Sequence, residues 1–136
     1  YFKNDFEIVP ITLLSDDFET LKEIGEEIAN TVNDGNIKDS AMIIASSDMT
    51  HYEPQGEAEK KDKAAIGAIL ELNADKLMDR IQRLNISMCG YAPVITMISA
   101  AKILGAKTAK LIKYQTSGDV TGDKNSVVGY AGIIIY

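Results

Sequence analysis

Two apolar runs near the start of the chain predict buried strands. The first is FEIVPITLL, Phe6 to Leu14, in which Pro10 marks a bulge or an edge. The second is AMIIA, Ala41 to Ala45. Because this second run is apolar at every position, it is typical of a parallel strand that is covered on both faces.

The stretch between these two runs predicts an amphipathic helix. Asp16, followed three residues later by Glu19, matches an N-terminal capping pair, and NDGN at Asn33 to Asn36 predicts the end of the helix. The apolar positions recur at helical spacing and form one stripe: Leu21, Ile24, Ile28 and Val32. A strand, a helix and a strand in this order predict a right-handed crossover between parallel strands.

Three further helices are predicted in the middle of the chain. The first covers Glu57 to Leu72, with charged residues on one side and apolar residues on the other. Asn73 is placed to cap the second, whose apolar residues are Ala74, Leu77, Met78, Ile81 and Leu84. The third, Ala92 to Leu104, is apolar nearly all round, which predicts a central, buried helix that ends at Gly105.

The C-terminal part predicts two more strands, Thr108 to Gln115 and Val127 to Tyr136, joined by SGDVTGDKNS at Ser117 to Ser126. Together, these patterns predict an α/β fold: a mainly parallel or mixed sheet, continued by the two C-terminal strands and covered by helices on both faces. Residues 1–136 are expected to form a single domain.

Composition narrows the class of protein. Hydrophobic residues make up 46% of the sequence, which is enough for a real core, and the net charge is −6 with a pI near 4.7. This acidic balance argues against a nucleic-acid partner, which a basic patch would bind. No apolar run is long enough to cross a membrane, and the single cysteine fits a reducing, cytoplasmic compartment.

The segment ASSDMTHYEP, Ala45 to Pro54, contains the only histidine of the chain. It directly follows a predicted strand, where open α/β sheets bind their ligands. Asp48 and His51 are three residues apart, so one helical turn would point both toward the same cavity. An acid beside an imidazole can fix its tautomer for proton transfer or metal ligation. Alternatively, Ser47 or Asp48 only caps the following turn and His51 lies on the surface.

Cys89 is the second candidate residue. It lies in SMCGYAP, immediately before the predicted buried helix, and Gly90 follows it. Unpaired amides and the helix dipole at that end favour a thiolate, the form that binds metals. The alternative is a small buried hydrophobic side chain, the common role of a lone free cysteine.

The acidic loop SGDVTGD, Ser117 to Asp123, is the third candidate. Its acids suggest calcium, but their spacing is not that of an EF-hand loop. The alternative is a hairpin connection in which Gly118 and Gly122 adopt unusual backbone angles.

Three segments together resemble a known family. SSDMTHYEP, MCGYAP and YQTSGDVTGDKNSVVGYA, in this order and with these gaps, resemble the C-terminal half of the Memo family. Its prokaryotic members are often labelled AmmeMemoRadiSam system protein B. The resemblance covers essentially the whole chain, and Tyr114 to Ala131 is its most specific part. It implies that residues 1–136 are the C-terminal part of a longer Memo-like domain, similar to half of a class III extradiol dioxygenase-like domain.

The resemblance also implies roles for three residues. The cysteine of the family's CG-x-x-P segment is a metal ligand, which corresponds to Cys89 here. The aspartate and histidine of S-S-D-x-x-H line the same pocket and correspond to Asp48 and His51. The family's two ligand histidines belong to the N-terminal half, and this sequence has no residue that matches them. Because a thiolate is a soft ligand, the resemblance favours iron, copper or zinc as the cofactor of the full-length protein.

Two functions of different classes follow from this resemblance. In the first, which we favour, the full-length protein is a metal-dependent redox or oxygenase-like enzyme in which His51 moves protons beside Asp48. In the second, the same pocket binds a small molecule or a peptide without turnover. The acidic surface argues mildly against phosphate-rich ligands in that case, since like charges repel.

This chain alone supplies few ligands, because a firm soft-metal site needs three or four. We therefore expect it neither to hold a metal tightly nor to catalyse a reaction, and we expect the Cys89 thiol to react readily. A sheet edge or face should also be left uncovered, where the N-terminal half or a second copy of the chain would dock.

Overall fold

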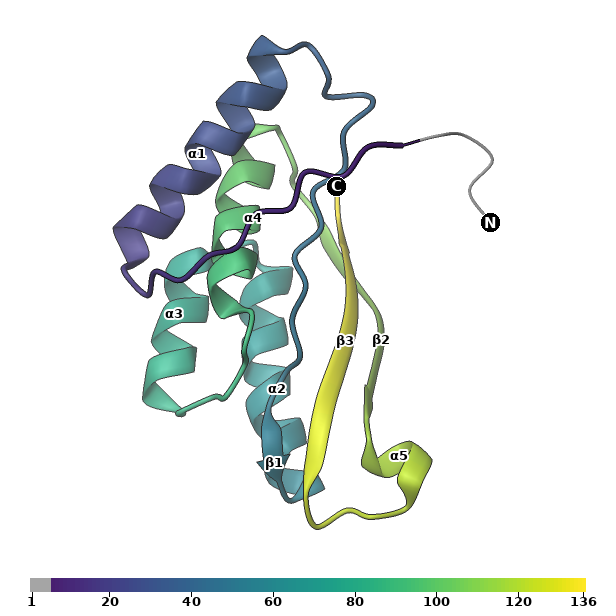
Figure 1. The fold of residues 1–136 in the computed structure, drawn as a ribbon. Helices are drawn as coiled ribbons and strands as arrows, with labels where there is room; N and C mark the ends of the chain where they lie inside the picture. The colour runs from purple at the N-terminus through teal and green to yellow at the C-terminus, as the bar shows by residue number, and fades with distance from the viewer. Residues whose placement is uncertain (1–5) are drawn as a thin grey trace.

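A computed structural model describes residues 6–136 and has an α/β architecture, as predicted (Figure 1). The elements follow one another in this order: α1 (Phe18–Asp34), β1 (His51–Glu53), α2 (Gln55–Leu70), α3 (Ala74–Arg83), α4 (Tyr91–Ile103), β2 (Ala109–Thr116), α5 (Gly118–Thr121) and β3 (Val127–Ile135). The predicted helices correspond to α1, α2, α3 and α4. Helical periodicity depends on local sequence, so it placed these elements well.

Two side-chain caps fix where helices begin. Asn73 caps α3 as predicted, because its Oδ1 accepts the backbone N–H of Lys76 at 2.8 Å. The prediction for α1 was wrong by one residue. Asp17 rather than Asp16 is the cap, and its Oδ2 accepts the backbone N–H of Thr20 at 2.8 Å.

The strands form a sheet in the order β1-β3-β2, and both pairings are antiparallel. β2 pairs with β3 from Ala109 opposite Ile135 to Thr116 opposite Gly129, with an irregularity between Leu111 and Lys113. The prediction of a mainly parallel sheet is therefore wrong for the described residues. The short strand β1 escaped prediction because three polar or aromatic residues carry no apolar alternation.

The two apolar runs predicted as strands, 6–14 and 41–45, form no strand, so the predicted crossover unit is also wrong. Most of their side chains are exposed, Leu14 by 94%, Met42 by 84% and Ile44 by 79%. Among the hydrogen bonds of residues 6–136, none involves the backbone of residues 41–46. An apolar run becomes a strand only when another strand accepts its hydrogen bonds, and no part of the described chain does so.

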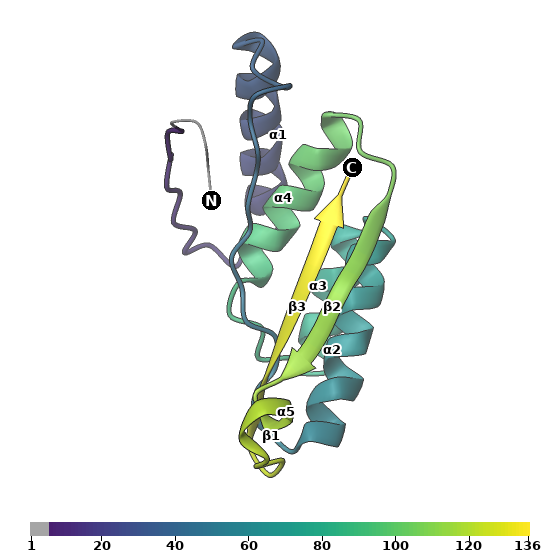
Figure 2. The same cartoon turned by 90° about the vertical axis from the view of Figure 1, so that its right-hand side faces the viewer.

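The helices form a layer on one face of the sheet, not on both faces as predicted (Figure 2). α2 packs against β2 and β3, and α1 packs on α4. At this second crossing, Gly25 lets the helices approach closely, since a Cβ there would lie 2.5 Å from the carbonyl oxygen of Thr96. The buried core lies between the helices and the sheet and includes Leu21, Leu77, Ile95 and Ile98.

None of the helices within residues 6–136 has the length and apolar character required to cross a bilayer.

Candidate metal centre

The segment that carries Asp48 and His51 is attached to the sheet on one side. Backbone hydrogen bonds join Met49 N–H to the carbonyl of Gly129 at 2.9 Å, and Gly129 N–H to the carbonyl of Thr50 at 3.0 Å. These bonds extend the short β1–β3 ladder upstream to Met49. Asp48 and His51 therefore lie on either side of two residues, Met49 and Thr50, whose backbone is bound to β3.

A buried carboxyl group attaches the same segment to α2. Asp62 is fully buried, and its Oδ1 accepts the backbone N–H of Thr50 at 2.9 Å. Its Oδ2 accepts the hydroxyl proton of Tyr114 in β2 at 2.7 Å. Burial and this bond to Asp62 raise the pKa of Tyr114. The sequence analysis missed Asp62, because it looks like one more charged residue of α2. Its position among the apolar residues on the buried side of that helix could have revealed it.

Cys89 reaches the segment because the backbone before α4 lies against it. Gly90, the N-cap residue of α4, donates its N–H to Ser47 Oγ at 2.9 Å. A Cβ at Gly90 would collide with the carbonyl oxygen of Ser46 and lie 2.5 Å from Ser47 Cβ. Only glycine permits this approach, which places Cys89 beside Asp48.

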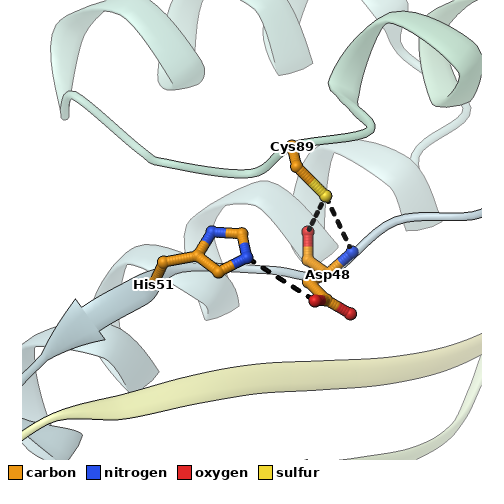
Figure 3. A group of neighbouring side chains, drawn as sticks. All are labelled: Asp48, His51 and Cys89. Carbon is orange, nitrogen blue, oxygen red and sulfur yellow. Dashed lines mark hydrogen bonds and ion pairs between the residues drawn. The ribbon is translucent and has the colours of Figure 1, made fainter.

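The Cys89 side chain is exposed, so it is not the small buried hydrophobic residue of the alternative interpretation. Asp48 donates its backbone N–H to Cys89 Sγ at 3.3 Å, although the two residues are 41 positions apart. The sulfur also lies 3.9 Å from the Asp48 carbonyl oxygen, so two contacts with the Asp48 backbone fix its position (Figure 3).

His51 is held in one tautomer. Its Nδ1 lies 2.6 Å from the backbone carbonyl oxygen of Ser87, and a carbonyl oxygen only accepts, so Nδ1 carries the proton. The backbone N–H of His51 also donates to Ser87 Oγ at 2.8 Å. In the neutral ring, the lone pair is then on Nε2, which lies 3.6 Å from Asp48 Oδ2 (Figure 3).

The three donor atoms form one cluster. A carboxylate oxygen of Asp48, a ring nitrogen of His51 and the Cys89 sulfur all lie within 4.8 Å of one another (Figure 3). The three residues therefore lie together, as predicted, whereas a shared pocket and their chemical roles remain predictions. Two ligands of one tetrahedral metal stand about 3.4 Å apart, given metal–ligand bonds of about 2.1 Å. The Asp48–His51 separation is close to that distance.

The acidic loop before β3 forms no such cluster. It contains the short helix α5, which ends at Gly122 with a φ of +81°. Asp119 Oδ2 accepts the backbone N–H of Thr116 at 2.8 Å, and this bond lowers the pKa of Asp119. Asp123 Oδ1 accepts the backbone N–H of Asn125 at 2.9 Å. These acids order the turn, and within residues 6–136 the one group of potential metal ligands is that of Asp48, His51 and Cys89.

This α/β chain gathers oxygen, nitrogen and sulfur donors beside its sheet. Such a donor set places it among proteins with a candidate site for a soft or borderline metal. Comparison with known proteins specifies the family. A family model described as Memo-like protein matches residues 1–134. The chain belongs to this family, in agreement with the resemblance found in its motifs.

Several similar proteins carry the name MEMO1 family protein. The chain is 52% identical over 130 residues to a MEMO1 family protein of Methanocaldococcus jannaschii, an alignment that covers 96% of this chain and 45% of the relative. It is 50% identical over 130 residues to one of Methanococcus maripaludis, with the same coverage. For one of Methanosarcina mazei the identity is 45% over 134 residues, covering 98% and 49%. The chain thus spans about half the length of the curated relatives it matches.

Proposed function

We propose that this chain supplies one wall of the metal centre of a metal-dependent redox or oxygenase-like enzyme, formed by a full-length Memo-like domain. In this proposal Cys89 is a metal ligand, and Asp48 and His51 handle protons beside it. The observation that carries the proposal is the cluster of three different donor atoms within 4.8 Å. These atoms come from two segments that are far apart in the sequence, and several hydrogen bonds fix both segments.

The donor set fits iron, copper or zinc. Thiolate and imidazole ligands suit these metals, whereas calcium and magnesium prefer sites made of oxygen atoms alone. The surroundings of the ring fit a proton acceptor beside the metal, because the Nδ1–H of His51 is bound to the carbonyl of Ser87 and Nε2 stays available. The rest of the domain would supply the remaining ligands, since a catalytic site usually has three from protein.

A bound iron or copper ion would supply one-electron chemistry, and a bound zinc ion would polarise a substrate oxygen. The chain's own residues have simpler tasks. The Asp48 backbone N–H positions the Cys89 sulfur, and the carbonyl of Ser87 keeps the His51 proton on Nδ1. His51 Nε2 is then free to accept a proton from a bound molecule, and the Asp48 carboxylate, 3.6 Å away, stabilises the imidazolium that forms.

The test measures metal affinity and thiol reactivity together. A full-length domain carrying these residues and the 136-residue chain are each titrated with Fe(II), Cu(I) and Zn(II), while alkylation of Cys89 is followed. We expect tight one-to-one binding that protects Cys89 in the full-length domain, and weak binding with free alkylation in the shorter chain. Cys89→Ser should abolish tight binding, and Asp48→Asn should weaken it by about 10- to 100-fold.

Asp119→Asn is the matched control, because Asp119 is an acid outside the cluster whose hydrogen bonds order a turn. It should leave metal affinity unchanged. If the full-length Cys89→Ser variant binds all three metals as tightly as the unmodified domain, Cys89 is not a ligand and the proposal is wrong. Tight binding by the 136-residue chain alone would show that its own three donors suffice.

A further inference from the structure

One edge of β3 has no partner over most of its length. β2 occupies the other edge from Gly129 to Ile135. On the free edge, backbone hydrogen bonds from the segment containing β1 end at Gly129. Within residues 6–136, no backbone hydrogen bond reaches residues 130–135 from this side. Proteins rarely leave a long apolar edge unpaired, since it offers a template to any extended chain.

The chain upstream of β1 is placed to pair with this edge but does not. Figure 1 shows residues 41–48 running antiparallel to β3 as they descend toward β1. After the bond between Met49 and Gly129, an antiparallel ladder would continue with residues 41–47 opposite 131–136. Instead the two backbones diverge, and both stay without hydrogen bonds to each other.

A groove lies between the two diverging backbones. Its volume is about 960 Å³, and its walls are residues 41–45 on one side and 131–136 on the other. Its floor comes from the helix layer and is apolar, with Ile69 of α2 and Val94 and Met97 of α4. The groove therefore combines two rows of unpaired backbone groups with an apolar floor.

The volume of the groove matches one strand. From the usual strand spacing, sheet spacing and rise, a strand residue in a packed sheet occupies about 160 Å³. The groove would thus accommodate about six residues, the usual length of a strand. A strand placed there would bond to β3 on one side and to residues 41–45 on the other, and it would turn the latter segment into the strand that its sequence predicts.

We propose that an extended segment from the part of the Memo-like domain beyond the matched residues inserts into this groove as a strand. The segment would carry apolar side chains at alternate positions, facing the floor. The length of the relatives supports this occupant, because each has about as many residues again outside the aligned region as within it. In the relatives these residues belong to the same chain as the aligned region, so they are always present beside it. The proposal concerns assembly of the sheet and does not depend on the metal centre.

Amide hydrogen exchange tests the proposal directly. It is measured on a full-length domain that carries these 136 residues and, beside it, on the 136-residue chain at low and high concentration. In the full-length domain we expect at least 100-fold slower exchange for alternate amides of residues 41–46 and of residues 130–135. Exchange within seconds at these positions in the full-length domain would overturn the insertion. Protection that appears in the shorter chain as its concentration rises would assign the groove to a second copy instead.

Thermal unfolding of two variants tests the insertion independently. Ile44→Lys places a charge on the proposed strand pair, and Val120→Lys is the control, because Val120 in α5 is 84% exposed and lies away from the groove. In the full-length domain, Ile44→Lys should lower the melting temperature by at least about 5 °C, while Val120→Lys should leave it within about 1 °C. Equal, small effects of both substitutions would show that the groove beside Ile44 stays open, which would contradict the insertion. The exchange experiment needs no variant, so it decides the matter even if Ile44→Lys does not fold.

Discussion

Replacing Asp62 with alanine should destabilise the protein by about 3 kcal/mol and loosen the segment that carries Asp48 and His51. The structure gives this magnitude in two parts. The backbone N–H of Thr50, a fully buried residue, would lose its acceptor at 2.9 Å. A buried donor without a partner costs about 1–3 kcal/mol. Loss of the 2.7 Å bond from Tyr114 adds about 1 kcal/mol, since that hydroxyl is only partly buried.

Urea unfolding followed by circular dichroism at 222 nm measures the change. Asp79→Ala is the matched control, because Asp79 is an exposed acid paired with Arg83 and should cost less than about 0.5 kcal/mol. Tyr114→Phe should cost about 1 kcal/mol alone and almost nothing when Asp62 is already alanine, because the bond is then absent.

Two results would refute this reasoning. One is an Asp62→Ala variant that loses less than about 1 kcal/mol, which would mean that Thr50 finds another acceptor. The other is an equal cost of Tyr114→Phe in both backgrounds, which would show that the two side chains are not coupled.

Three further predictions concern other parts of the structure. Gly90→Ala should push Ser47 away from the start of α4 and destabilise the protein by about 1–3 kcal/mol in urea unfolding, whereas a neutral result would show that the contact relaxes. Asn73→Ala should cost about 1 kcal/mol and Asn73→Ser almost nothing, because serine also caps; equal costs would exclude the cap as the cause. Because burial and Asp62 raise the pKa of Tyr114 above 10.0, the associated stability is fully present below pH 10 and is lost as the pH rises beyond it. Tyr114→Phe should therefore flatten alkaline unfolding curves, and unchanged curves would contradict the shift.

The sequence alone determined the elements whose stability is local. The four long helices follow from apolar spacing, and Asn73 marks the start of α3 because its side chain replaces a missing backbone partner. The paired tail strands follow from alternation on both sides of a glycine-containing loop. The two segments that carry Asp48, His51 and Cys89 were also recognisable, since reactive residue types stand directly beside predicted element ends.

Tertiary structure decided everything that requires a distant partner. Residues 41–45 have the composition of a strand, yet they stay unpaired, because a strand exists only where another backbone accepts its hydrogen bonds. The antiparallel order β1-β3-β2 depends on which edges meet, which local pattern does not encode. Asp62 looks like a surface acid until the fold buries it against Thr50.

The candidate site depends on both levels. Its residue types are visible in the sequence, but the distance between Asp48 and Cys89 is set by the close contact at Gly90 across 41 positions. Such a contact depends on the missing Cβ of one residue and on the shape of the opposite backbone. No local propensity contains that information, because it arises only when packing brings the two segments together.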